Sequence, residues 1–239
     1  MKLSVIIPAY NEEKRLPRTL REIDEYLKKQ DYDSEIIVVS DGSTDKTVEV
    51  VKNLMNYIEN LKILDFKKNR GKGFGVRQGM LKAMGDYRLF TDADNSTSID
   101  QVEKMWPFFE KGYDVVIGSR DVKGAVLSPP QPWWRRLLGD IFRFLTHIIC
   151  GTWGILDTQC GFKGFTKKAA ENIFKETKIN GFAFDPEILV IAKKFGYKIK
   201  EIPVRWRNDP ESKVKFKNMI KMGIGLFKIR LNLISHKYD

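Results

Sequence analysis

The chain has 239 residues, enough for one substantial domain, and 42% of them are hydrophobic, as in an ordinary globular protein and unlike a disordered one. Its formal net charge of +11 favours an anionic partner. The two cysteines, Cys150 and Cys160, form no CxxC pair and no Cys/His metal spacing, so the sequence indicates neither a zinc site nor a disulfide framework. No run of about 18 apolar residues occurs, so we expect no transmembrane helix.

The first half alternates short apolar runs with helical patterns. We expect buried strands at residues 3–7, 35–39, 61–64, 87–90 and 114–117. Between them we expect helices at about 15–29, from 43–45 onward, at 73–84 and at 99–111. This order predicts an α/β fold with a mostly parallel sheet covered by helices on both faces, in which ligands bind at the carboxyl ends of the strands.

The second half contains two amphipathic helical patterns. In residues 133–149, one face carries Trp134, Leu138, Ile141, Leu145 and Ile148, and another carries Arg136, Asp140, Arg143 and His147. This pattern is typical of a helix in a membrane interface, and equally of a helix packed on the protein's own core. Residues 215–236 repeat it with recurring lysines, and two such helices in a basic chain favour contact with an anionic membrane surface.

The pair Asp92 and Asp94 follows an apolar strand. Residues two apart in an extended chain point to the same side, so we expect both carboxylates to face one ion. Hard cations such as Mg²⁺ prefer carboxylate oxygens together with substrate phosphates, and a diphosphate leaving group needs such a cation. The pair is therefore a candidate site for Mg²⁺ or Mn²⁺, although most Asp-x-Asp sequences are surface carboxylates.

Two further motifs flank predicted helices. Asp41-Gly-Ser-Thr-Asp45 follows a buried strand, and Asp41 is suited to accept hydrogen bonds from a base or ribose, while a helix cap explains the remainder. The segment 69–75 places Lys72 among glycines before a helix, where a lysine contacts phosphate, although the spacing is not that of a P-loop. A flexible turn is the alternative for this segment.

Taken together, these motifs resemble the family 2 glycosyltransferases, which have the GT-A fold. The matching segments are Val5-Ile-Ile-Pro-Ala-Tyr-Asn-Glu12, Asp41-Gly-Ser43, Asp92-Ala-Asp94 and Gly118-Ser-Arg120. Four more segments are similar to the dolichyl-phosphate β-glucosyltransferases: Asn69-Arg-Gly-Lys-Gly73, Asp157-Thr-Gln-Cys-Gly-Phe-Lys163, Phe182-Ala-Phe-Asp-Pro-Glu-Ile-Leu189 and Glu201-Ile-Pro-Val-Arg-Trp206. The related mannosyltransferases match the segment at 157–163 less well.

The resemblance implies an inverting enzyme that moves a sugar, most naturally glucose from UDP-glucose, onto dolichyl or polyprenyl phosphate. The implied nucleotide-sugar site consists of Pro8, Tyr10, Glu12, Asp41, Lys72, Asp92, Ala93 and Asp94, of which the two aspartates at 92 and 94 hold the cation. The implied acceptor-phosphate residues are Arg120, Arg136 and Lys213. Asp185 and Glu187 lie where the family has acidic residues near the acceptor. Three roles are open for them: to order sugar hydroxyls, to order a basic cluster, or to cap a helix.

Two departures from the family accompany the resemblance. Ser40 stands where the family usually has the first of two aspartates, which implies altered local hydrogen bonding around Asp41. The eukaryotic glucosyltransferases carry an N-terminal membrane anchor that this sequence does not show, so we expect amphipathic helices to attach the protein peripherally, at the cytoplasmic face. Residues 1–213 are the expected GT-A domain, including the interface helix at 133–149, and 214–239 a basic amphipathic helix.

Three alternatives stay open at this point. One is a mannosyltransferase that uses GDP-mannose. Another is a family 2 enzyme with a saccharide acceptor, whose hydroxyl needs a base such as Asp185. The last is a non-enzymatic basic module that binds membrane or nucleic acid. The sequence shows no RRM, KH, zinc-finger or helix-turn-helix signature, so we expect no nucleic-acid partner.

Overall fold

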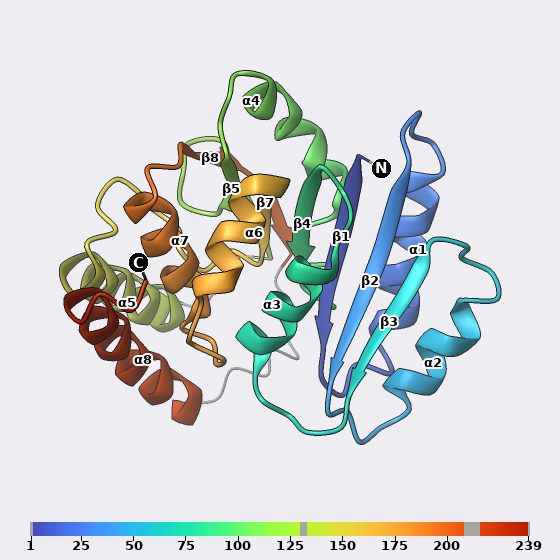
Figure 1. The fold of residues 1–239 in the computed structure, drawn as a ribbon, viewed down its shortest axis with the longest axis horizontal. Helices are drawn as coiled ribbons and strands as arrows, with labels where there is room; N and C mark the ends of the chain where they lie inside the picture. Colours follow the sequence, from blue (N-terminus) through green and yellow to red (C-terminus); the bar gives the residue numbers. More distant parts are fainter. Residues whose placement is uncertain (1, 130–132, 208–215, 239) are drawn as a thin grey trace.

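A computed structural model describes residues 2–129, 133–207 and 216–238. For residues 133–136 and 216–218 it describes the backbone alone. A seven-stranded sheet lies at the centre, in the order β3-β2-β1-β4-β7-β5-β8 (Figure 1). Its strands are β1 (Leu3–Ala9), β2 (Ser34–Asp41), β3 (Leu61–Phe66), β4 (Tyr87–Thr91), β5 (Val115–Ser119), β7 (Phe162–Thr166) and β8 (Ile199–Pro203). Every neighbouring pair is parallel except the two that involve β7, which confirms the predicted α/β class.

Helices cover both faces of this sheet, as predicted. One face packs against α1 (Leu16–Leu27), α2 (Thr47–Leu54), the 3-10 helix η1 (Ile99–Lys104) and α4 (Trp106–Glu110). The other packs against α3 (Lys72–Lys82), α6 (Lys167–Glu176) and α7 (Phe184–Lys194). Side chains alternate along a strand, so Val5 and Ile7 join the first layer while Ile6 joins the second, which explains why the strand is apolar throughout.

The helix expected at 99–111 is instead divided into η1 and α4. Pro107 lies in the first turn of α4. Proline has no backbone N–H to continue a helical hydrogen-bond ladder, and its ring clashes with the preceding turn. The sequence contained this signal, so the single helix was a wrong prediction.

Two features of the second half were not predicted. The strand β7 runs antiparallel to its neighbours, so the chain just before it, residues 157–161, lies at the edge where the parallel strands end. A separate parallel pair joins β6 (Val126–Ser128) to β9 (Arg205–Arg207). From β9, the Arg207 N–H donates to the Ser96 carbonyl at 2.7 Å, which ties β9 to the chain that follows Asp94.

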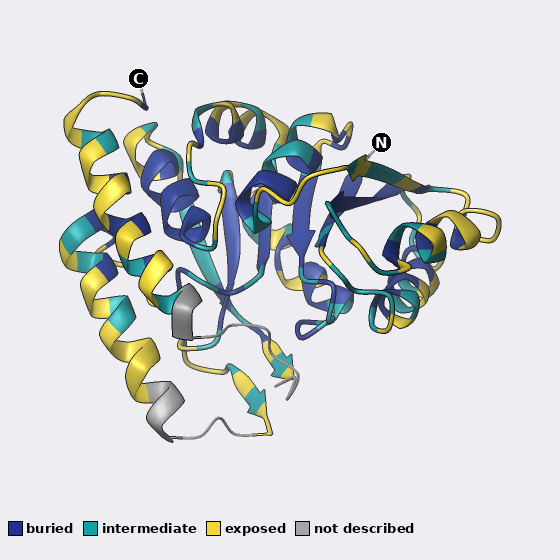
Figure 2. Ribbon diagram, turned by 90° about the horizontal axis from the view of Figure 1, so that it is seen from below, coloured by how far each residue is buried: buried dark blue, intermediate teal, exposed yellow. Residues whose placement is uncertain are grey.

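The expected amphipathic helices are present as α5 (Trp133–Cys150) and α8 (Phe216–Ile234), and they pack side by side (Figures 1 and 2). Their inner sides form a small apolar cluster with α7 that includes Cys150, Val190, Leu226 and Ile229. Gly225 permits this approach, because a Cβ there would lie 2.3 Å from the Cβ of Ala183.

The other sides of α5 and α8 are apolar and exposed. We call this surface the outer apolar face; it consists of Leu137, Leu138, Ile141, Phe144, Leu145, Ile148, Ile220, Ile224, Phe227, Leu231 and Ile234. Among these are four of the five residues expected on one face of the first helix, so the idea that this face packs on the protein's own core is wrong. Within the described residues, no helix combines the length and apolar character needed to cross a bilayer.

Candidate active site

The carboxyl ends of β2, β1 and β4 lie next to one another and carry the predicted donor residues. Loops from these ends are hydrogen-bonded together. The Glu12 N–H donates to the Thr47 hydroxyl at 2.8 Å, and the Thr19 hydroxyl donates to the Ala93 carbonyl at 2.8 Å. The sheet therefore brings the motifs around Asp41, Glu12 and Ala93 to one edge, as a parallel α/β sheet does with its ligand site.

Asp92 and Asp94 lie in a turn after β4. The segment is not extended as expected, because Asn95 adopts a positive φ of 52° and the Asn95 N–H donates to the Asp92 carbonyl at 3.2 Å. An Asp94 carboxylate oxygen accepts the Ser96 N–H at 3.0 Å. Burial, and then the neighbouring Asp92 charge, raise the pKa of Asp94 above its usual value. Two carboxylates that repel each other in this way are suited to share a cation.

Lys72 supplies a positive charge at this turn. Its Nζ lies 2.6 Å from an Asp92 carboxylate oxygen. Burial alone would lower the pKa of Lys72, but the charges of Asp92 and Asp185 raise it, so the ammonium stays protonated. Gly71 and Gly73 permit this placement, because a Cβ at either position would lie within 2.6 Å of the Asn180 or Ile179 carbonyl oxygen.

Asp41 holds the loop that carries Lys72. Its carboxylate accepts the backbone N–H of Arg70 at 2.9 Å and that of Gly71 at 2.6 Å. Asp41 is buried, and the two hydrogen bonds that it accepts fix the loop that carries Lys72. The neighbouring Ser40 is fully buried, and its hydroxyl is among the buried side-chain atoms of the described chain that find no hydrogen-bond partner.

The remaining predicted nucleoside residues follow β1. Pro8 faces the start of α3, since a Cβ on Gly75 would make ordinary contact with it at 3.5 Å. Tyr10 is exposed. Both carboxylate oxygens of Glu12 accept from the Arg15 guanidinium, at 2.7 and 2.8 Å. Of these three residues, Tyr10 is the exposed one, and Pro8 and Glu12 are partly buried.

Arg120 follows β5 and is paired with a buried carboxylate. Its Nε and Nη2 donate to the two oxygens of Asp157 at 2.7 and 2.9 Å, and its backbone N–H donates to the same group at 3.0 Å. Although burial opposes it, the Arg120 charge lowers the pKa of Asp157 to about 2. This side-on pairing leaves the Nη1 edge of the guanidinium out of the bidentate contact. Sequence reasoning had given Asp157 no role, although this residue begins one of the family-like segments.

Asp185 belongs to a second buried ion pair. Its carboxylate oxygen lies 2.5 Å from Nζ of Lys163, which also donates to the Cys160 carbonyl at 2.6 Å. Lys163 is fully buried in β7. Burial raises the pKa of Asp185, while Lys163 and Lys72 oppose that rise. Asp185 therefore lies close to the charges of both Lys163 and Lys72. Sequence reasoning had given Lys163 no role.

Gly161, the residue just before β7, leaves room for the Asp92 carboxylate. A Cβ at Gly161 would lie 2.1 Å from one Asp92 oxygen and 2.8 Å from the other. The φ angle of Gly161 is not positive, so glycine is required here because a side chain would not fit, and not because of an unusual backbone conformation. The reversed strand β7 thus forms one wall of the carboxylate site.

The two carboxylates fit a divalent cation of the Mg²⁺ type. In proteins Mg²⁺ is usually bound by one or two carboxylates and completes its shell with substrate phosphates and water. Asp92 and Asp94 are two carboxylates close enough for their charges to interact, which is the number that such a site uses. No cluster of three or more His, Cys, Asp or Glu that could bind a metal occurs among the described residues. The predicted residues Arg136 and Lys213 lie outside the described side chains.

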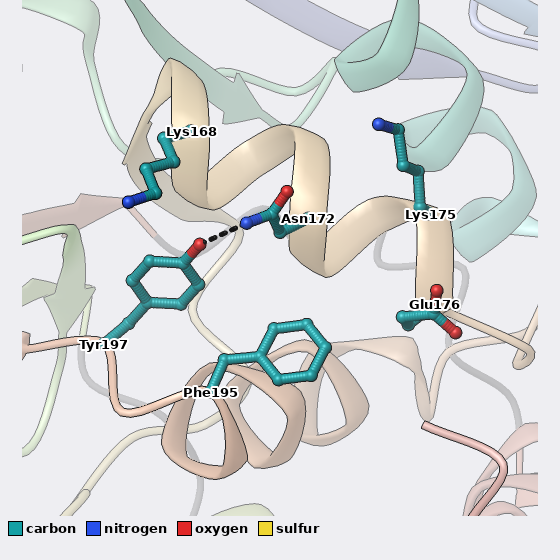
Figure 3. A pocket seen from close by; sticks show the side chains of 6 residues that line it. All are labelled: Lys168, Asn172, Lys175, Glu176, Phe195 and Tyr197. Atoms are coloured by element: carbon teal, nitrogen blue, oxygen red, sulfur yellow. Dashed lines mark hydrogen bonds between the residues drawn. The ribbon is translucent and has the colours of Figure 1, made fainter. Parts of the chain in front are cut away.

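A surface hollow lies elsewhere, on the outer side of α6 and the chain after α7. It is lined by Lys168, Asn172, Lys175, Glu176, Phe195 and Tyr197, and the Asn172 amide donates to the Tyr197 hydroxyl at 2.7 Å (Figure 3). None of the predicted site residues lines this hollow.

Comparison with known proteins agrees with this geometry. Residues 4–174 match the family described as Glycosyl transferase family 2. A dolichyl-phosphate β-glucosyltransferase of Trichomonas vaginalis is 40% identical over 96% of this chain and 73% of its own length. The enzyme of that name from Homo sapiens is 38% identical over 98% of this chain and 76% of its own.

Among solved structures, glucosyl-3-phosphoglycerate synthase from Mycobacterium tuberculosis, in complex with Mn²⁺, UDP and phosphoglyceric acid, has a TM-score of 0.64. The two chains are 17% identical, and the match covers 99% of this chain and 78% of that one. This likeness concerns the fold, which is of the GT-A type. The non-enzymatic alternative is thereby overturned, and the chain belongs to glycosyltransferase family 2, among relatives named dolichyl-phosphate β-glucosyltransferases.

Proposed function

We propose that this enzyme transfers glucose from UDP-glucose onto dolichyl or another polyprenyl phosphate at a membrane surface, with inversion at the sugar carbon. The observation that carries the proposal is the similarity to dolichyl-phosphate β-glucosyltransferases along 96–98% of the chain. The site supports it, because Asp92, Asp94 and Lys72 lie together at the carboxyl edge of the sheet.

In this proposal Asp92 and Asp94 hold a divalent cation, Mg²⁺ or Mn²⁺, together with the donor diphosphate. When bound, the cation neutralises charge that builds on the departing UDP. Lys72 pairs with Asp92 in the donor-free enzyme and contributes its positive charge to the diphosphate when the donor arrives. Tyr10 offers its exposed ring to the nucleoside, and Pro8 and Asp41 shape the floor beneath it.

The acceptor requires little chemical activation. A phosphate oxygen is already anionic at neutral pH, so in-line positioning is the main task of the protein. Arg120 is the described residue suited to hold the acceptor phosphate, because Asp157 fixes the guanidinium while its Nη1 edge is outside that pairing. Arginine suits phosphate because its planar fork binds two oxygens. Arg136 and Lys213 stay candidates for the same task.

A saccharide acceptor is less well supported. Its hydroxyl must lose a proton, and Asp185 was the candidate base. Asp185 is only 4% exposed, and its carboxylate is bound by Lys163. A base has to come within hydrogen-bond reach of the proton that it removes. The lipid-phosphate acceptor, which needs no base, is therefore the better fit.

We further propose that the outer apolar face of α5 and α8 attaches the enzyme peripherally to the cytoplasmic side of a membrane, with residues 1–213 as the catalytic part. On α8, Lys221, Lys228 and Arg230 are exposed beside this face. An apolar stripe flanked by basic residues is typical of helices that lie in an anionic lipid interface. Phe227→Glu should reduce flotation with anionic vesicles, whereas Tyr57→Glu, also at an exposed aromatic residue, should not.

The first experiment supplies purified protein with dolichyl phosphate, Mg²⁺ or Mn²⁺ and radiolabelled UDP-glucose or GDP-mannose. We expect label from UDP-glucose in the organic phase, its loss with EDTA and with Asp94→Asn, and its retention in the surface control Asp31→Asn. Label from GDP-mannose alone would overturn the choice of donor. Absence of lipid label, with transfer to a saccharide, would overturn the choice of acceptor.

A further inference from the structure

The side chain of Tyr238 is fully buried, four residues after the end of α8. Its hydroxyl donates to a Glu187 carboxylate oxygen at 2.7 Å and accepts from the Asn232 amide at 3.1 Å. Its ring joins the same apolar layer as α3, α6 and α7. A buried tyrosine hydroxyl normally has such a partner, and here the partner is a charged group inside the catalytic part of the fold.

Glu187 transmits this contact to a backbone segment. The Glu187 side chain is fully buried in the first turn of α7. Besides the Tyr238 hydroxyl, its carboxylate accepts the N–H of Lys178 at 2.9 Å and that of Ile179 at 3.0 Å. Burial of this carboxylate is tolerable because several donors surround it. Glu187 therefore links the end of α8 to residues 178–179.

That segment in turn holds the first turns of α3. The Phe74 N–H donates to the Asn180 carbonyl at 3.2 Å. Arg77 donates to the Thr177 carbonyl at 2.8 Å and to the Asn180 side-chain oxygen at 3.0 Å. Lys72 is the first residue of α3, so its position follows that of the segment 177–180.

We propose that Tyr238 and Glu187 are positioning residues for the donor site, acting through the segment 177–180 to hold Lys72 against Asp92. The proposal rests on the proposed function in one respect, the contact of Lys72 with the donor diphosphate. Removing the Tyr238 hydroxyl takes one donor from a buried carboxylate, which is costly. We expect the Glu187 carboxylate then to move toward another donor, and the backbone N–H groups of Lys178 and Ile179 that are bound to it to move as well.

The test is Tyr238→Phe, which keeps the ring and removes the hydroxyl. The matched control is Tyr197→Phe, which removes a hydroxyl bound to Asn172 in the surface hollow. We expect the Kd for UDP with Mg²⁺, measured by calorimetry, and the KM for the sugar donor both to rise roughly three- to tenfold in Tyr238→Phe, the range that one lost hydrogen bond covers. The KM for dolichyl phosphate and both constants of Tyr197→Phe should stay at wild-type values.

A double-mutant cycle separates positioning from a general loss of stability. If Tyr238 acts through Lys72, Tyr238→Phe should add no further change to the UDP Kd in a Lys72→Met background. Asn180→Ala, which loosens the same segment from the α3 side, should reproduce the weaker UDP binding. A lower Tm with unchanged UDP Kd in both Tyr238→Phe and Asn180→Ala, or full additivity with Lys72→Met, would overturn the proposal.

The binding readout also separates this inference from the proposed function. Wild-type protein that binds UDP without transferring glucose to dolichyl phosphate would refute the function alone. Wild-type transfer with an unaltered UDP Kd in the Tyr238 variant would refute the positioning role alone.

Discussion

The close approach of Gly161 to Asp92 predicts that the variant Gly161→Ala folds but has little transferase activity. In Gly161→Ala the new Cβ would lie 2.1 Å from an Asp92 oxygen. Ordinary contact begins at 3.4 Å, so that oxygen has to retreat by about 1.3 Å. The clash falls on the far end of a side chain that can rotate, and Gly161 has no positive φ, so the backbone has no need to move.

The expected loss is therefore catalytic. Displacing a positioned group by about 1 Å costs up to roughly 100-fold in rate. We expect a loss of that order in kcat/KM for transfer to dolichyl phosphate, with weaker Mn²⁺-dependent binding of UDP. The free energy of unfolding should change by about 1 kcal/mol or less, because the displaced Asp92–Lys72 pair is partly exposed.

The assay combines transfer kinetics, UDP calorimetry and thermal unfolding. Gly181→Ala is the matched control, since a Cβ there meets nothing within 4 Å and its φ is not positive. It should keep wild-type activity. A Gly161→Ala enzyme with wild-type kcat/KM and UDP affinity would refute the reasoning that Asp92 must occupy this position.

Three further outcomes are expected. Asp94→Asn should abolish transfer yet raise the Tm of the donor-free protein in calorimetry, because burial and Asp92 disfavour the charged form of Asp94; a lower Tm would contradict this. Arg120→Gln should lower the free energy of unfolding in urea by about 3 kcal/mol, because it leaves Asp157 buried without its partner; a change under about 1 kcal/mol would count against the pair. The folded-state pKa of Asp157 is lowered to about 2, below its unfolded value of about 3.9. The stability that Asp157 contributes is therefore fully present above about pH 3.9 and is lost as the pH falls from there toward about 2. Unfolding measured as a function of pH should show a smaller loss over this range in Arg120→Gln than in the wild type.

Much of the first half was predictable, because each element there is a local pattern. An apolar run indicates the strand that ends in Ser40 and Asp41, and glycines mark the helix that begins at Lys72. A parallel sheet then brings the ends of its strands together whatever lies between them. This is why the motifs at Asp41 and Asp92 could be expected at one edge of the sheet, while the place of Lys72 beside them came from the family resemblance.

The partners of these residues were not predictable in the same way. Asp157 and Lys163 acquire their roles from β7, whose reversed direction depends on pairing with β4 and β5 far away in the chain. The hydrophobic periodicity of a short segment does not indicate whether a strand runs parallel or antiparallel to its neighbours. The same holds for Glu187. Its motif left open a role with sugar hydroxyls, with a basic cluster or as a helix cap, whereas its observed partners are the N–H groups of residues 178–179 and the hydroxyl of Tyr238.

The exposed stripes of α5 and α8 have a practical consequence for the protein in a test tube. In water, a second copy of the chain can cover these exposed apolar side chains. The sedimentation coefficient should therefore increase with protein concentration and fall when a mild detergent is added. Extraction should follow the same chemistry: high salt weakens contacts made by Lys221 and Lys228, but Phe227 and Leu231 retain their preference for an apolar phase until detergent supplies one.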